Sequence, residues 1–198
     1  MRKFLLLASS VAIISNTACS TKNSSISSKK SVSNTYKASN LSSYNEQMLS
    51  YINKVRAKGA VCAPPAGPLQ WSSKLEQAAK SHVKDMALND TISHIGSGTA
   101  LDPAKSSIGI GSTFIDRIKY FGYNVKTGQL VGENITKTYV KLTKSDKLMP
   151  NFKRAITNLL NDKPHCEIIM NPRFNDVGMA MFKRGDIYYF TMELAHRP

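Results

Sequence analysis

The sequence predicts an α+β fold in which helices pack in layers against an antiparallel hairpin. Three observations predict it: two capped amphipathic helical segments lie early in the chain, a third follows Pro150, and two extended runs joined by a Gly-containing loop come last. Helices followed by an antiparallel hairpin favour an α+β layer architecture. The 198 residues suffice for one domain with a tail.

The first predicted helix begins at Ser43 and ends at Gly59. Ser43 and Glu46 have the spacing of a capping box, in which the hydroxyl and the carboxylate each satisfy a free backbone N–H. Apolar side chains then recur at helical spacing up to Val55. A loop with several prolines follows, and these prolines exclude regular structure there.

The second predicted helix runs from Ser73 to about Leu88. Ser73 and Glu76 match a second capping box. His82 lies on the apolar stripe of this helix. We therefore expect His82 to be a hydrogen-bonded histidine of the core rather than a chemically active group.

The second half of the chain is predicted to hold two helices and three strands. A short helix covers residues 113–121, a strand begins at 132–135, and a helix with an apolar face covers 150–160 because proline fits a first turn. The final extended runs, 177–183 and 187–194, form a hairpin around a Gly-containing loop.

Residues 1–18 have the features of a secretory signal peptide. Arg2 and Lys3 precede an apolar run over residues 4–14, and small residues then lead to Cys19. This run is shorter than the roughly 20 residues that span a bilayer. The Thr-Ala-Cys that ends at Cys19 resembles the lipobox of bacterial lipoproteins, so we expect Cys19 to be lipidated. The alternative is plain secretion, with Cys19 merely close to a cleavage site.

The segment after the signal peptide is expected to be a tether. Residues 19–42 are rich in serine and lysine and hold almost no large apolar side chain, so burial cannot offset the entropy of ordering them. We expect a flexible, lipid-anchored tether over 19–42 and one domain over 43–198.

The chain is strongly basic, with 27 Lys and Arg against 13 Asp and Glu and a formal net charge of +14. Six of the basic residues lie before Glu46, so the remainder keeps an excess of eight positive charges. Such a surface suits anionic lipids or anionic envelope polymers. Nucleic acid is not an expected partner, because the chain has an export signal and no recognised nucleic-acid motif.

Several short motifs occur together and in a fixed order between residues 52 and 179. They are Ile52–Arg56, Leu69–Trp71, Lys84–Met86, Ser93–Gly96, Gly122–Tyr123, Gly132–Ile135, Pro164–Cys166, Ile169–Phe174 and Val177–Met179. The ordered set resembles the CAP superfamily of cysteine-rich secretory proteins, antigen 5 and plant pathogenesis-related proteins of group 1, and in particular its bacterial, lipoprotein-like SCP-domain branch. The resemblance covers about residues 43–196. It implies an α-β-α sandwich with a small, mainly antiparallel sheet between helical layers.

The resemblance also implies a central cleft with two histidines and two acids. By motif, His94 matches the first histidine, Glu133 the glutamate of Gly-Glu-Asn, and His165 the second histidine. At the fourth position the family has a Trp followed three residues later by Glu, whereas this chain has Leu159 and Asp162. Asp is one methylene shorter than Glu, which puts its reach to His165 in question.

This set of residues is suited to three tasks. Imidazoles flanked by carboxylates bind a divalent cation such as zinc, perform acid–base chemistry, or brace the cleft floor by pairing. We expect bracing or weak cation binding by His94, Glu133, His165 and Asp162, with no firmly held cofactor. No complete nucleophile constellation is visible, so the catalytic residues stay unassigned.

The leading functional interpretation is an exported, lipid-anchored, monomeric binding module of the bacterial envelope. It would sit in the outer membrane or at the cell surface if the organism is a diderm, and take a lipid, a cation, a peptide or an anionic envelope polymer. The alternative is a metal-assisted hydrolase or protease that uses His94, Glu133 and His165.

A disulfide between Cys62 and Cys166 is also expected. Lipidation of Cys19 leaves two of the three cysteines, and export places them where disulfides persist. The chain resembles bacterial relatives that have cysteines at both places, and this resemblance implies that the bridge ties the proline-containing loop over the cleft. Cys166 is expected just after the last helix. The alternative is two free thiols, each a small buried hydrophobe.

We predict that Cys19 is acylated and forms the mature N-terminus, because lipid anchoring follows if this cysteine carries the acyl chains. Mass spectrometry of the N-terminal peptide from the native host should show a lipid-modified cysteine. An unmodified terminus would contradict the prediction. Ser20 follows instead of Asp, and by resemblance to lipoprotein sorting signals this favours the outer membrane in a diderm host.

Overall fold

The computed structural model describes residues 43–197. The expected signal peptide, tether and lipidated Cys19 lie outside these residues. The elements are, in order, α1 (Ser43–Lys58), β1 (Gln70–Trp71), α2 (Ser73–Leu88), α3 (Phe114–Tyr120), β2 (Val131–Tyr139), α4 (Val140–Thr143), α5 (Leu148–Leu160), α6 (Lys163–Met170), β3 (Asp176–Arg184) and β4 (Ile187–Ala195). No helix in the described part is both long and apolar enough to cross a membrane.

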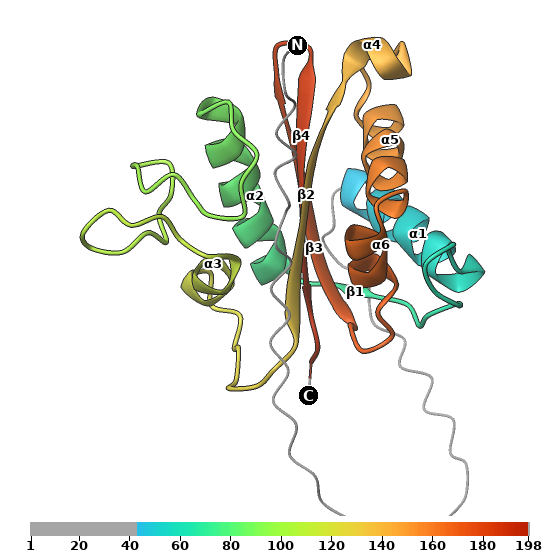
Figure 1. Ribbon diagram of the computed structural model, residues 1–198, viewed down its shortest axis with the longest axis horizontal. Helices are drawn as coiled ribbons and strands as arrows, with labels where there is room; N and C mark the ends of the chain where they lie inside the picture. The colour runs from blue at the N-terminus through green and yellow to red at the C-terminus, as the bar shows by residue number, and fades with distance from the viewer. Residues whose placement is uncertain (1–42, 198) are drawn as a thin grey trace, which may run out of the picture.

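The sheet has the strand order β1-β3-β4-β2. It is antiparallel except for the short parallel pairing of β1 with β3. Figure 1 shows the sheet between two helical layers, with α2 and α3 on one side and α1, α5 and α6 on the other. The predicted α+β fold, an α-β-α sandwich, is confirmed. Strand β2 lies at one edge of the sheet and contacts helices of both layers, α3 on one side and α5 and α6 on the other.

Strand β4 has an apolar side chain at almost every position because both of its faces are covered. Phe190, Met192 and Leu194 pack into the cluster formed with α1, α5 and α6. Tyr189 faces the other way and packs against α2. Since side chains alternate along a strand, Glu193 shares the face of Tyr189 and is buried with it.

The start of α2 corrects one prediction. Ser72 is the N-cap residue and its hydroxyl accepts from the N–H of Leu75, whereas Ser73 is already helical. Glu76 is therefore one residue too far along to complete a capping box. Its carboxylate instead accepts hydrogen bonds from Trp71 and Asn45, which ties α2 to β1 and α1.

A separate helix, α6, corrects a second prediction. Cys166 was expected just after the last helix, but it lies within α6 and is fully buried. The chain breaks its helical run after Leu160 and begins again at Lys163, with Pro164 in the first turn. Proline lacks the N–H that a first turn leaves unused, which explains why a new helix begins there.

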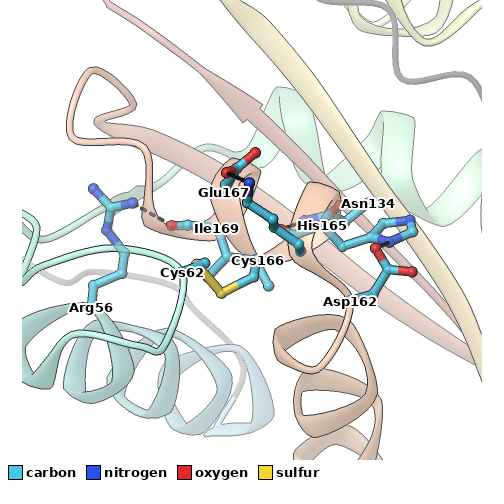
Figure 2. Close-up of a disulfide and its surroundings, with 9 residues drawn as sticks. Arg56, Cys62, Asn134, Asp162, His165, Cys166, Glu167 and Ile169 are labelled. Atoms are coloured by element: carbon cyan, nitrogen blue, oxygen red, sulfur yellow. Dashed lines mark hydrogen bonds and ion pairs between the residues drawn. A yellow bond between two sulfur atoms is a disulfide. The ribbon is translucent and has the colours of Figure 1, made fainter.

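Two connections hold α6 against α1. Cys62 and Cys166 form the expected disulfide, with 6.1 Å between their Cα atoms (Figure 2). Arg56 of α1 is fully buried and donates to the carbonyl oxygen of Gly67. It also donates to the carbonyl oxygen of Ile169 in α6 (Figure 2). Burial lowers the pKa of Arg56 because it disfavours the charged form. The loop after α1 is therefore fastened to α6 by one covalent bond and by one buried cation.

We predict that reducing the Cys62–Cys166 disulfide lowers the free energy of unfolding. The bridge joins residues 104 positions apart, and closing a loop of this size contributes up to about 4–5 kcal/mol on the chain-entropy model. Urea unfolding with and without reductant measures the effect. A Cys62→Ala/Cys166→Ala variant is the control, since reductant should not change its midpoint. An unchanged wild-type midpoint would contradict the prediction.

Candidate functional site

One cavity gathers three of the four predicted site residues, His94, Glu133 and His165, whereas Asp162 does not line it. It has a volume of about 370 Å³ and lies at the edge strand β2, where the two helical layers meet. Its walls are mostly apolar. The lining residues are His94, Ile95, Thr113, Phe114, Leu130, Val131, Gly132, Glu133, His165, Glu167, Ile168, Asn171 and Phe174.

The two histidines reach this cavity from opposite layers. His94 follows α2, and its Nδ1 lies 2.7 Å from Oε1 of Glu133. A carboxylate only accepts, so Nδ1–H donates and Nε2 is the ring nitrogen not bonded to Glu133. The His94 side chain is 36% exposed, whereas that of Glu133 is 1% exposed. Glu133 therefore orients the imidazole from below, at the floor of the cavity.

Glu133 is held in turn by a buried arginine. Arg117 of α3 places Nη2 2.6 Å from Oε2 of Glu133, and both side chains are 1% exposed. Burial raises the pKa of Glu133, but the Arg117 guanidinium and the His94 hydrogen bond together hold it below its usual value. Glu133 is therefore a stable carboxylate.

Arg117 also fixes the backbone that carries His94. It donates to the carbonyl oxygen of His94 at 3.1 Å and to that of Ser112 at 2.8 Å. One guanidinium thus binds strand β2 through Glu133 and the segment between α2 and α3 through these two carbonyls. The position of His94 depends on Arg117 twice, through its own backbone and through Glu133.

A second buried carboxyl, Glu193, lies opposite Glu133 on the neighbouring strand β4. Glu193 is fully buried, and Nε of Arg117 is 4.0 Å from its Oε1. Within residues 43–197, neither carboxyl oxygen of Glu193 has a partner at the distance and angle of a hydrogen bond. Burial raises the pKa of Glu193 well above its usual value, and the adjacent Glu133 charge raises it further. Glu193 therefore keeps its proton to a higher pH than an exposed glutamate.

His82 behaves as the buried core histidine expected. Its Nε2 lies 2.8 Å from the carbonyl oxygen of Ser93 and 3.7 Å from Oε2 of Glu133. Burial lowers its pKa, against the opposing effect of the Glu133 charge. A neutral imidazole that donates from Nε2 to Ser93 fits these contacts, and it fixes the chain just before His94.

The second histidine also has an acidic neighbour. Nδ1 of His165 is 3.0 Å from Oδ1 of Asp162, at an angle unsuited to a hydrogen bond, so the contact is an ion pair when the imidazole is protonated. The shorter Asp162 side chain thus does reach His165. Asn134 of β2 donates to the carbonyl oxygen of His165 at 3.2 Å and fastens α6 to the edge strand (Figure 2).

The acidic and histidine side chains of the site form separate pairs rather than one cluster of metal ligands. Within residues 43–197, no group of three or more His, Cys, Asp or Glu side chains is placed to hold one. The two oxygens of Glu133 face His94 and Arg117, while Asp162 faces His165. Weak cation binding at these residues stays a prediction.

Sequence reasoning missed Arg117 and Glu193, which complete the buried cluster. Arg117 lies at helical spacing with Phe114 and Ile118 on the apolar side of the short helix, and Glu193 lies between Met192 and Leu194. A charge at a position that periodicity assigns to the interior is the signal that identifies such residues.

We predict that Glu193→Gln stabilises the fold increasingly as the pH rises. The folded-state pKa of Glu193 is above its unfolded value, so its stabilising contribution is complete below about pH 4.5 and is lost as the pH rises through the folded pKa. Gln keeps the shape and carries no proton to lose. Thermal unfolding of both proteins from acidic to mildly alkaline pH measures the difference.

The comparison isolates Glu193 because His82, whose lowered pKa gives the opposite trend, is present in both proteins. A difference in melting temperature that stays constant across this range, or shrinks as the pH rises, would contradict the assignment of a raised pKa to Glu193.

Known proteins resemble this chain in sequence and in fold. A family model described as the cysteine-rich secretory protein family, CAP, matches residues 49–194. An extracellular protein containing an SCP domain from Bacillus anthracis has a similar structure, with a TM-score of 0.54 and 20% identity, over 77% of this chain and 40% of that one. This chain thus spans less than half of the Bacillus protein.

A second similar structure is an outer surface protein from Borrelia burgdorferi, with a TM-score of 0.52 and 19% identity, over 77% of this chain and 92% of that one. No curated protein matches the sequence. At these identities the structural likeness supports the fold alone, while the family model covers most of the chain. The chain therefore belongs to the CAP family, the cysteine-rich secretory protein family.

Proposed function

We propose that this CAP domain is a binding module whose cavity takes a small amphipathic molecule with an apolar body and an anionic head. The observation that carries the proposal is the composition of the cavity: its walls are mainly apolar, and His94 and His165 enter from opposite layers. The other polar lining residues are Thr113, Glu133, Glu167 and Asn171, and Glu167 is paired with Lys163. Pockets of 300–1,000 Å³ with a few polar groups on an apolar lining are typical of small-molecule sites.

The apolar body would lie against side chains of both layers. Phe114 comes from α3, Ile168 from α6, and Leu130 and Phe174 from the segments that precede β2 and β3. Leu130, Ile168 and Phe174 are mostly buried even without a ligand, and they belong to the main core cluster. A hydrocarbon chain would therefore extend a packed apolar surface and lose its contact with water.

The anionic head would lie between the histidines. His94 donates from Nδ1 to Glu133, so its protonated form directs a second N–H from Nε2 to another acceptor. His165 has a comparable acidic neighbour in Asp162. Because the charge of Glu133 is already paired with Arg117, it repels an incoming anion less than a free carboxylate would.

We further propose that the domain acts outside the cytoplasm, held to a membrane by a lipid on Cys19. Two observations support this placement: the basic-then-apolar start of the chain, and similar folds in proteins described as extracellular and as an outer surface protein. The excess of basic residues adds a contact with anionic lipids or envelope polymers.

The alternative of a metal-assisted hydrolase or protease is less favoured. If Glu133 is to act as a ligand or as a base, it must release His94 or Arg117, because both of its oxygens already face a donor. A binding role uses the observed pairs unchanged. An activity screen on the wild type and on a His94→Ala/His165→Ala variant separates the two interpretations.

We predict that a His94→Gln/His165→Gln variant binds an anionic amphiphile roughly tenfold more weakly, or worse, because charge-assisted hydrogen bonds to the head are lost. A fluorescent lauric acid is the probe, and the matching lauryl alcohol is the neutral comparison. The alcohol should bind the variant and the wild type alike, since the apolar walls are unchanged.

A Lys153→Gln variant is the matched control, because Lys153 is an exposed cation of α5 outside the cavity lining. It should bind both probes as the wild type does. Equal weakening of acid and alcohol, or loss of acid binding in the Lys153 variant, would contradict a head-group role for the histidines.

A further inference from the structure

We propose that the segment between α2 and α3 inserts its isoleucine side chains into a bilayer that contains anionic lipids. In the described part of the chain, every exposed isoleucine lies in this segment: Ile92 is 40%, Ile95 51%, Ile108 80% and Ile110 62% exposed. Figure 1 shows the segment as two loops that project from the α2–α3 layer, away from the sheet. We call residues 91–113 the projecting segment.

Glycines let the two limbs of the projecting segment lie against each other. A Cβ at Gly98 would come within 2.1 Å of the carbonyl oxygen of Gly109, and one at Gly111 within 1.9 Å of that of Gly96. Such approaches are impossible for any other residue without moving the backbone. The short distance between the limbs leaves no room for Ile108 or Ile110 to fold inward between them.

Buried carboxylates hold this arrangement in place. Asp102 is 2% exposed and accepts from the backbone N–H of Ser112 at 2.8 Å and from its hydroxyl at 2.6 Å. Asp85 of α2 accepts in the same way from the N–H and hydroxyl of Ser97. The exposed isoleucines therefore stand on a fixed support, and little conformational entropy remains to be lost on insertion.

The chemistry of the projecting segment fits a lipid surface better than a protein partner. Its exposed apolar side chains are aliphatic, whereas protein interfaces favour Tyr, Trp and Arg anchors. Its only acid, Asp102, is buried, and it carries one partly exposed cation, Lys105. The domain also has a net positive charge, so anionic head groups attract it and nothing exposed on the segment repels them.

The docked position would bring the cavity close to the bilayer. Ile95 belongs both to the projecting segment and to the cavity lining, next to His94. The proposal does not require that the cavity bind a lipid. Insertion needs only a bilayer, and the quenching experiment reports on the projecting segment alone. A negative result would therefore leave the proposed ligand role of the cavity untouched.

Quenching of an introduced indole by brominated lipids tests the insertion. The full processed chain carrying Ile110→Trp is bound to vesicles of brominated phosphatidylcholine and phosphatidylglycerol, with the signal of native Trp71 subtracted by using the parent protein. A Leu142→Trp protein is the matched control. Leu142 is 51% exposed in α4, away from the projecting segment in Figure 1, and has Lys141 and Lys144 beside it.

We expect the indole at position 110 to lose most of its fluorescence and the one at position 142 to keep it. Adding Ile108→Ser to the Ile110→Trp protein should reduce the quenching severalfold, because one inserted aliphatic group is lost. Equal quenching at both positions, quenching at 142 alone, or quenching at neither would overturn the proposal.

Discussion

The buried ion pair between Arg117 and Glu133 is the constraint on which the site depends. It joins α3 to the edge strand β2, and the same guanidinium holds the backbone of His94. Either ion would carry a large desolvation cost if it were buried without its partner. Replacing Arg117 or Glu133 alone by a neutral residue therefore destabilises the fold. Glu193 adds a second acid beside this pair and relieves the excess negative charge by keeping its proton. The cluster therefore sets the position and the tautomer of His94.

The other half of the site depends on a separate set of connections. The Cys62–Cys166 bridge, buried Arg56 and the Asn134 hydrogen bond fix α6 to α1 and to β2 (Figure 2). Because β2 is an edge strand, the two layers meet there without a further strand between them, and a cavity remains. Each histidine is thus rigidly positioned by its own layer, and the cavity between them stays open to a ligand.

Much of the fold could be predicted from the sequence, because helix periodicity and the final hairpin are local signals. The errors were local as well: Ser72 rather than Ser73 caps α2, and α6 begins a new helix that contains Cys166. The buried cluster could not be predicted in full. Which partners Arg117 and Glu193 meet depends on the pairing of β2 with β4 and on the packing of α3, and these are properties of the tertiary fold.

Native mass spectrometry of the protein purified from its own host, with elemental analysis, tests the central claim most directly. If the cavity takes an anionic amphiphile, one small organic molecule per chain should be released from the folded protein, and a His94→Gln/His165→Gln protein should carry less of it. Recovery of one zinc ion per chain, with no organic molecule bound, would contradict this account of the cavity.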